Sequence, residues 1–174
     1  MNIRKVNIAD IDDIMKVEWS SFIAGIQEEK SVFEERIRRC PDLFLIFEQD
    51  DNVAGYLCAE FMDKVPESAD ELELGHLPAD ESLSQKVRKG FIYISSFAIL
   101  PAFRGAGVGR RMWNESLEYL RDHTGVEKFL LLVNEEWKGA RHIYESSGFS
   151  VVREFPEFFV TENGGRSSGV LMEK

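Results

Sequence analysis

The stretch FIYISSFAIL, residues 91–100, runs directly into PAFRGAGVGR, residues 101–110, and this junction decides the fold. The first part is rich in aromatic and β-branched residues and stops at Pro101, which predicts a strand at the centre of a sheet. Apolar residues near helical spacing follow over residues 108–123, and Gly125 supplies a helix stop. A buried strand that turns through glycines into a helix indicates an α/β protein.

The segments before this junction are predicted to form two helices and three strands. We expect a strand over residues 3–7, a helix over 10–22, a short helix over 31–39, and a hairpin of strands over 43–48 and 53–61. The short helix is expected to begin at a capping box formed by Ser31 and Glu34 and to end before Pro41. Residues 63–81 are strongly acidic, which indicates an exposed connection, and long connections in compact domains are often functional.

The segments after the junction alternate between strand and helix. We expect a strand over residues 128–133, a helix over 136–147 that ends at Gly148, and strands over 149–155 and 170–173. No internal repeat or linker interrupts this order, so one domain over residues 1–174 is expected.

Composition and charge limit the class of protein. The chain has 174 residues, of which 44% are hydrophobic and 30% charged, as in soluble globular domains. Its net charge of -10 disfavours nucleic acid and anionic membranes as partners and favours cationic ligands. The two cysteines, Cys40 and Cys58, indicate neither a disulfide framework nor a metal site, and no signal or membrane segment is indicated, so a cytoplasmic location is expected.

The glycine-rich turn is suited to binding a phosphate. Gly105, Gly107 and Gly109 allow several main-chain N–H groups to converge on an anion at a helix N-terminus. Arg104 and Arg110 add positive charge, which suits a pyrophosphate. The Walker pattern fails because no Lys-Ser or Lys-Thr follows, and a dinucleotide fingerprint fails because Arg110 stands where glycine is needed. A purely structural glycine turn is the alternative.

Two motifs resemble the GCN5-related N-acetyltransferase (GNAT) family. The segment Arg104-Gly105-Ala106-Gly107-Val108-Gly109 fits that family's R/Q-x-x-G-x-G/A acyl-CoA pyrophosphate loop. Downstream, Ala140-Arg141-His142-Ile143-Tyr144-Glu145-Ser146-Ser147-Gly148-Phe149 looks like its A-x-x-L/I-Y-E-x-x-G-F segment. The resemblance covers about residues 91–155, in the family's order.

The resemblance implies an α/β fold with a mixed, mostly antiparallel central sheet of six to seven strands, about four flanking helices and a splayed strand pair that holds acetyl-CoA. Backbone groups near Phe97, Ala98 and Ile99 would bond the pantetheine arm and polarise the thioester. The pyrophosphate would be held by main-chain N–H groups of the loop Arg104, Gly105, Ala106, Gly107, Val108, Gly109 and Arg110.

The resemblance also implies roles for residues beyond the loop. Tyr144 would protonate the departing CoA thiolate, and the alternative for it is a buried packing tyrosine. Many family members have an asparagine that contacts pantetheine three residues before the motif alanine, but here Trp137 stands there. The contact is therefore assigned either to Asn134, which is close in sequence, or to Trp137.

The general base and the acceptor site are predicted less directly. Tyr93 and Ser95 share one face of the central strand, and Glu60 on the preceding strand is a further candidate base through water. Each of these three could equally be an ordinary sheet residue. The acceptor pocket is expected near the first helices, lined by Phe22, Ile26 and Phe33.

These observations predict an N-acetyltransferase that moves an acetyl group from acetyl-CoA directly to a primary amine, without a metal. A small cationic amine is the first expectation, from the net charge and from Glu71 and Glu73 in the acidic connection. A protein N-terminal or lysine acetyltransferase is the alternative enzyme, and a non-catalytic acyl-CoA-binding module is the alternative of another class. A homodimer through the C-terminal strands is compatible with the family resemblance.

Overall fold

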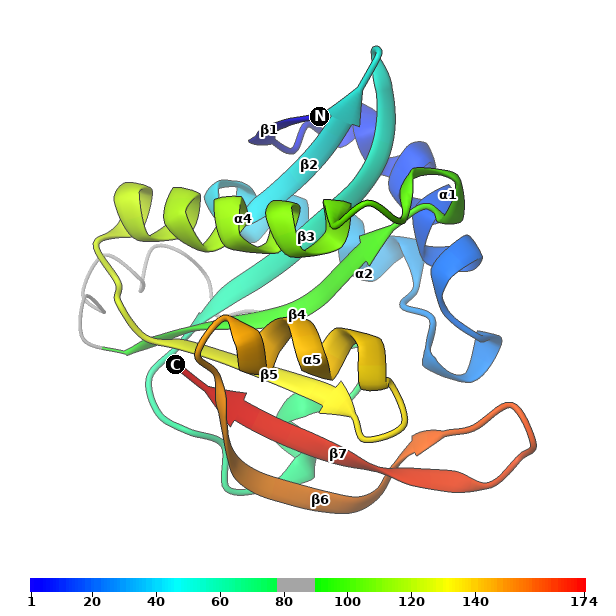
Figure 1. The fold of residues 1–174 in the computed structure, drawn as a ribbon, viewed down its shortest axis with the longest axis vertical. Coiled ribbons are helices and arrows are strands. Elements are labelled where there is room, and N and C mark those ends of the chain that lie inside the picture. Colours follow the sequence, from blue (N-terminus) through cyan, green and yellow to red (C-terminus); the bar gives the residue numbers. More distant parts are fainter. Residues whose placement is uncertain (78–89) are drawn as a thin grey trace.

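The fold of this protein, seen in a computed structural model that describes residues 1–77 and 90–174, is built on one sheet. Its seven strands lie in the order β1-β2-β3-β4-β5-β7-β6. They are β1 Asn2–Lys5, β2 Phe44–Gln49, β3 Asn52–Met62, β4 Phe91–Ile99, β5 Phe129–Asn134, β6 Ser150–Val160 and β7 Arg166–Glu173. Each neighbouring pair is antiparallel except β4 and β5. The predicted mixed, mostly antiparallel sheet is confirmed, with β4 at its centre (Figure 1).

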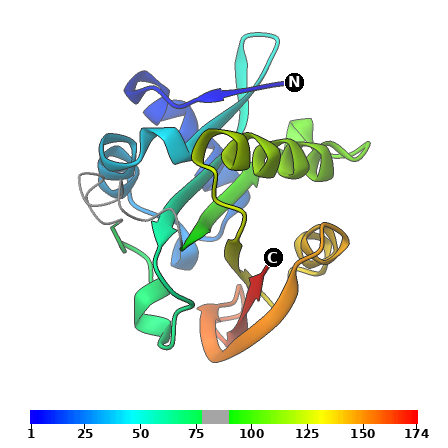
Figure 2. The same ribbon diagram turned by 90° about the vertical axis from the view of Figure 1, so that its left-hand side faces the viewer.

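Helices cover both faces of this sheet. The described helices are α1 Ile11–Ser21, α2 Lys30–Arg39, α4 Val108–Thr124 and α5 Lys138–Ser146. Figure 2 shows α1 and α2 on one side of the strands and α4 and α5 on the other. In the described part of the chain, no helix combines the length and apolar character needed to span a membrane.

Each face of the sheet has its own hydrophobic core. Under α4 and α5, Met112 and Trp113 are fully buried against side chains of β3, β4 and β5. Under α1 and α2, the ring of Phe33 packs on Phe44 and Tyr56, with centroids 5.9 and 5.5 Å away. The expectation that Phe33 lines an acceptor pocket is therefore wrong, because its side chain fills this core.

Turn residues place the element ends close to where the sequence predicts them. The β2–β3 hairpin turns at Asp50 and Asp51, with φ of 53° and 59°, a conformation that short acidic side chains tolerate. Gly125 ends α4 with φ of 71°. The C-terminal hairpin is longer than predicted, because β6 continues past Phe155 to Val160.

Two local predictions change. The short helix begins at Lys30 with Glu29 as its N-cap, so Ser31 lies inside the helix and the capping box with Glu34 does not form. The carbonyl of Glu29 instead accepts the N–H groups of the first turn, at 3.0 and 3.3 Å. In the acidic connection, Leu72 is buried rather than exposed, and residues 78–81 of that prediction lie outside the described residues.

The centre of the sheet carries two irregularities that create the site. Strand β4 pairs with β5 at only three positions, the last being Ile94 with Leu131, although both strands continue. On its other edge, the register with β3 shifts between Cys58 and Ala59, which places one extra residue, Ser95, in β4. Beyond Ile94 the two parallel strands therefore diverge, as the predicted splayed pair requires.

Candidate active site

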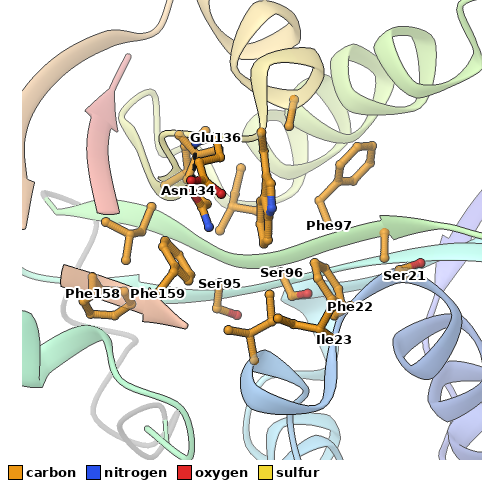
Figure 3. A pocket seen from close by; sticks show the side chains of 18 of the residues that line it. Ser21, Phe22, Ile23, Ser95, Ser96, Phe97, Asn134, Glu136, Phe158 and Phe159 are labelled. Atoms are coloured by element: carbon orange, nitrogen blue, oxygen red, sulfur yellow. Dashed lines mark hydrogen bonds between the residues drawn. The ribbon is translucent and has the colours of Figure 1, made fainter. Parts of the chain in front are cut away.

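A single large cavity occupies the opening between β4 and β5. It has a volume of about 1390 Å³ and is lined by the loop after β4, by the ends of both diverging strands, and by α1, α5 and β6. Figure 3 shows Ser95 and Ser96 on the same side of the β4 ribbon as Phe22 and Ile23, with Phe97 and Asn134 on the other side. The cavity thus joins the predicted cofactor segment to the predicted acceptor segment.

The loop before α4 has the conformation of an anion cradle. Gly105, Ala106 and Gly107 all have positive φ, at 101°, 46° and 77°. Within the described residues, the N–H groups of these three and of Gly109 and Arg110 have no hydrogen-bond acceptor, as expected for the open first turn of a helix. Such amides, together with the helix dipole, attract a phosphate group.

The side chain of Arg104, which was expected to bring positive charge to a pyrophosphate, makes hydrogen bonds within the protein. Its Nε donates to the carbonyl of Ile99 at 2.7 Å, and its terminal nitrogen donates to Ser21 Oγ at 3.1 Å. The guanidinium therefore ties the loop to the end of β4 and to the end of α1. Both Arg104 and Arg110 line the cavity.

Backbone alternation decides which groups of β4 face the opening. Leu100 N–H donates to the carbonyl of Ala54 in the β3 direction, so Ala98, two residues earlier, is also directed toward β3. The main-chain groups of Phe97 and Ile99 therefore face the side on which β5 has moved away. The carbonyl of Ile99 is taken by Arg104, which leaves the N–H of Phe97 as the donor closest to the divergence.

Tyr144 projects from α5 into the cavity wall. Its ring packs on Trp113 at 4.5 Å and on Phe149 at 6.4 Å between centroids. Its hydroxyl has no hydrogen-bond partner among the described residues, and burial raises the pKa of the phenol above its ordinary value of 10.0. A neutral, uncommitted phenol beside the opening is able to donate a proton.

The structure distinguishes Asn134 from Trp137, the two candidates for the contact with pantetheine. Asn134 Oδ1 accepts the Glu136 N–H at 2.9 Å and the Ser167 hydroxyl at 3.0 Å, so its amide nitrogen remains for the cavity (Figure 3). Trp137 packs instead between Phe22 and Phe159, with centroids 5.7 and 5.5 Å away. Asn134 therefore has the free donor, whereas Trp137 bridges α1 and β6 across the cavity.

The candidate bases lie together at the other end of the cavity. Glu60 of β3 and Tyr93 of β4 are cross-strand partners on the same face. Burial raises the pKa of Glu60 to about 7, although the Arg36 guanidinium opposes the shift. Burial and the nearby Glu60 carboxylate raise the pKa of Tyr93, which keeps that phenol neutral. Of the two, Glu60 is the group that exchanges a proton near neutral pH.

A buried polar network that links α1 and α2 to strands β3 and β4 was not predicted from the sequence. Glu18 of α1 accepts from the Tyr56 hydroxyl, which in turn lies 2.8 Å from Ser96 Oγ. Burial raises the pKa of Glu18. Arg36 of α2 donates to Ser95 Oγ at 3.3 Å. The sequence does contain a signal for this network, because Glu18 is a charged residue within the otherwise apolar buried face of α1.

The acidic connection contributes to the cavity unevenly. Glu71 accepts the N–H groups of Glu67 and Ser68, at 3.1 and 3.2 Å, and so caps the turn over Ala69–Leu72. Glu73 and His76 line the cavity. Of the two glutamates expected to attract a cationic acceptor, Glu73 therefore lines the cavity and Glu71 caps a turn.

Comparisons with known proteins agree with this geometry. The model of the "Acetyltransferase (GNAT) family" matches residues 10–149. An N-alpha-acetyltransferase of Sulfolobus acidocaldarius is 26% identical over 157 residues, which cover 90% of this chain and 84% of that protein.

Solved structures share the fold. The loading GNATL domain of CurA from Lyngbya majuscula superposes with a TM-score of 0.78 at 17% identity, over 99% of this chain and 96% of that one. Arabidopsis thaliana Naa50, in complex with the bisubstrate analogue CoA-Ac-MVNAL, gives 0.69 at 14% identity, over 99% and 97%. Since the family model spans most of the sequence, the chain belongs to the GNAT acetyltransferase family, and the predicted enzyme class, an acetyl-CoA-dependent N-acetyltransferase, is confirmed.

Proposed function

We propose that this protein transfers the acetyl group of acetyl-CoA to the α-amino group at the N-terminus of a peptide or protein. The observation that carries the proposal is the match, over 90% of the chain, to an N-alpha-acetyltransferase. The acceptor is then of the kind first considered as the alternative to a small amine.

The cavity supports an acceptor of extended shape. Beyond the strand opening it continues between the segment after α1, with Phe22 and Ile26, and the end of β6, with Phe158 and Phe159. These apolar walls offer contacts to the first side chains of a peptide, while Glu60 lies where its amino group would enter.

In this proposal the donor lies along the opening between β4 and β5. The loop from Arg104 to Arg110 holds the pyrophosphate through its free N–H groups, and Asn134 donates its amide to the pantetheine arm. The N–H of Phe97 donates to the thioester oxygen and stabilises the negative charge that develops there.

Glu60 and Tyr144 divide the proton transfers. Glu60, as carboxylate, takes a proton from the acceptor ammonium, and the freed nitrogen lone pair attacks the thioester carbonyl. As the tetrahedral intermediate collapses, the carbon–sulfur bond breaks and Tyr144 gives its proton to the thiolate. The amide nitrogen then loses its second proton, which restores Tyr144, so the net products are amide, CoA thiol and one proton.

The test compares acceptors that differ only in their amines. CoA release and product mass are measured with a peptide bearing a free N-terminus and no lysine, with the same peptide N-terminally blocked, and with a blocked peptide containing lysine. Turnover of the first alone is expected. Turnover of the lysine peptide alone, or of none of the peptides, would refute the proposal.

A small cationic amine is the second candidate acceptor, favoured by the placement of Glu73 in the cavity wall beside the region of Glu60. Polyamines and arylalkylamines belong in the same assay. If they are acetylated with higher kcat/KM than any free peptide N-terminus, and if neutralising Glu73 raises their KM, this candidate replaces the first.

A further inference from the structure

The side chain of the candidate base is almost completely buried. The side chain of Glu60 is 5% exposed, whereas that of His76, whose Nε2 lies 3.6 Å from Glu60 Oε2, is 39% exposed. One nitrogen of the imidazole thus faces the carboxylate while the ring as a whole reaches the surface. A histidine in this position spans the distance between the buried carboxyl and bulk water.

The backbone at Gly75 and His76 is held in place by hydrogen bonds. Arg36 donates to the carbonyl of His76 at 2.9 Å, and Gly75 N–H donates to both carboxylate oxygens of Glu28 at 3.1 Å. Arg36 and Glu28 are themselves a buried ion pair at 3.2 Å. The pair therefore holds His76 against Glu60, and the contact is a built feature of the fold.

Burial and charged neighbours shift the pKa values of both groups, that of Glu60 upward and that of His76 downward. Glu60 faces Arg36 of α2, Tyr93 of β4 and, along its own strand, the buried thiol of Cys58. Burial raises the pKa of Glu60 to about 7. Burial and Arg36 lower the pKa of His76, and Glu71 partly opposes them.

We propose that His76 is the proton outlet of the active site, passing to solvent the proton that Glu60 removes from the acceptor ammonium. The inference rests on the proposed acetyl transfer. His76 Nε2 accepts the proton from the carboxylic acid of Glu60, and the imidazolium releases its Nδ1 proton to water. Proton exchange of the neutral ring with water then moves its remaining proton from Nε2 back to Nδ1, so both the carboxylate and Nε2 are ready for the next ammonium. This is the one net proton of the reaction, so no further reactant is required.

Kinetics of His76→Gln test the proposal. Glutamine removes the titratable ring and keeps a polar side chain of similar reach. We expect kcat to fall by about tenfold, less than the loss of a direct acid or base causes, with KM for acetyl-CoA unchanged. Added imidazole should restore much of the rate. His123→Gln is the matched control, because His123 stacks on Tyr119 on the outer part of α4, and it should behave as wild type. Wild-type kcat in His76→Gln, or a loss that imidazole does not reverse, would overturn the proposal.

An NMR titration separates this inference from the proposed function, since it needs no turnover. The chain has 3 histidines, so their ring signals are readily assigned. In Glu60→Gln the pKa of His76 should fall, because a neighbouring carboxylate is lost. An unchanged His76 pKa would refute the coupling even in an enzyme that acetylates peptides. A wild-type enzyme inactive on every free N-terminus would refute the proposed function, whatever the titration shows.

Discussion

Replacing Tyr144 with phenylalanine isolates one hydroxyl group. The ring contacts with Trp113 at 4.5 Å and with Phe149 at 6.4 Å remain in Tyr144→Phe. The hydroxyl has no partner among the described residues, so its removal leaves no orphaned donor or acceptor and should change the free energy of unfolding by less than about 0.5 kcal/mol. Its loss as an acid should lower kcat by about 10²- to 10⁴-fold.

The assay combines steady-state kinetics, an acetyl-CoA titration and a denaturant melt on Tyr144→Phe. Acetyl-CoA affinity and stability should stay near wild type while kcat falls. Tyr119→Phe is the control, because Tyr119 lies on the same side of the sheet, on α4, and does not line the cavity. A Tyr144→Phe enzyme with wild-type kcat would refute the acid assignment, and a parallel loss of stability would make Tyr144 a packing residue.

Three further changes address the base, the cofactor loop and the sheet. In Glu60→Gln the rise of kcat/KM with pH through about 7 should disappear, since only the carboxylate accepts the proton. Because the pKa of Glu60 is raised, the folded wild type binds more protons than the unfolded chain between pH 4.5 and about 7. Its free energy of unfolding should therefore fall across this range as the pH rises, by up to about 3 kcal/mol. Denaturant melts of Glu60→Gln should lack this fall. Gly107→Val, at a φ of 77°, should raise the acetyl-CoA Kd by about tenfold in a direct titration, because a β-branched residue strains that conformation and turns the amides away. Gly55→Ala places a Cβ 2.4 Å from the Ala98 carbonyl and should cost about 1 to 3 kcal/mol in a melt, whereas Gly139→Ala meets no atom within 4 Å and should not destabilise.

The sequence is sufficient to predict the order of most elements because hydrophobic spacing and turn residues are local signals. The central strand, its exit at Pro101 and the stop of α4 at Gly125 are all encoded within a few residues. The failed capping box at Ser31 shows the limit. Residues before α2 are held by a contact from α1, where Glu18 accepts the Glu28 N–H at 2.7 Å, and no local pattern contains that information.

The candidate site divides in the same way. A glycine loop can be recognised as an anion cradle because N–H convergence depends on local φ values. The partner of a long side chain depends on tertiary structure, so the use of Arg104 to clamp β4 to α1 was not predictable. The contact of His76 with Glu60 joins a residue within the acidic connection to the strand that precedes it, and its geometry depends on the buried pair of Arg36 with Glu28.

One inserted residue in β4 explains why the two halves of the cavity have different chemistry. Side chains alternate along a strand with period two, so the extra residue at Ser95 exchanges the faces of all residues that follow. Phe97 consequently joins Ile94 under α4, where its ring lies 5.3 Å from Trp113, and Ser96 joins the face of α1 and α2. If the same ten residues alternated regularly with no bulge, Ser96 would lie in the apolar core and Phe97 on the face of α1 and α2.

The insertion also coincides with the point where β4 leaves β5, because the last pair between those strands is at Ile94. The same position therefore opens the space between β4 and β5 and places two serines in the wall of the cavity. The sequence shows no alternation that would reveal it, since every residue from 91 to 100 except Ser95 and Ser96 is apolar. The bulge is therefore visible only in the pairing of β3 with β4, and it lies at the candidate site of the reaction.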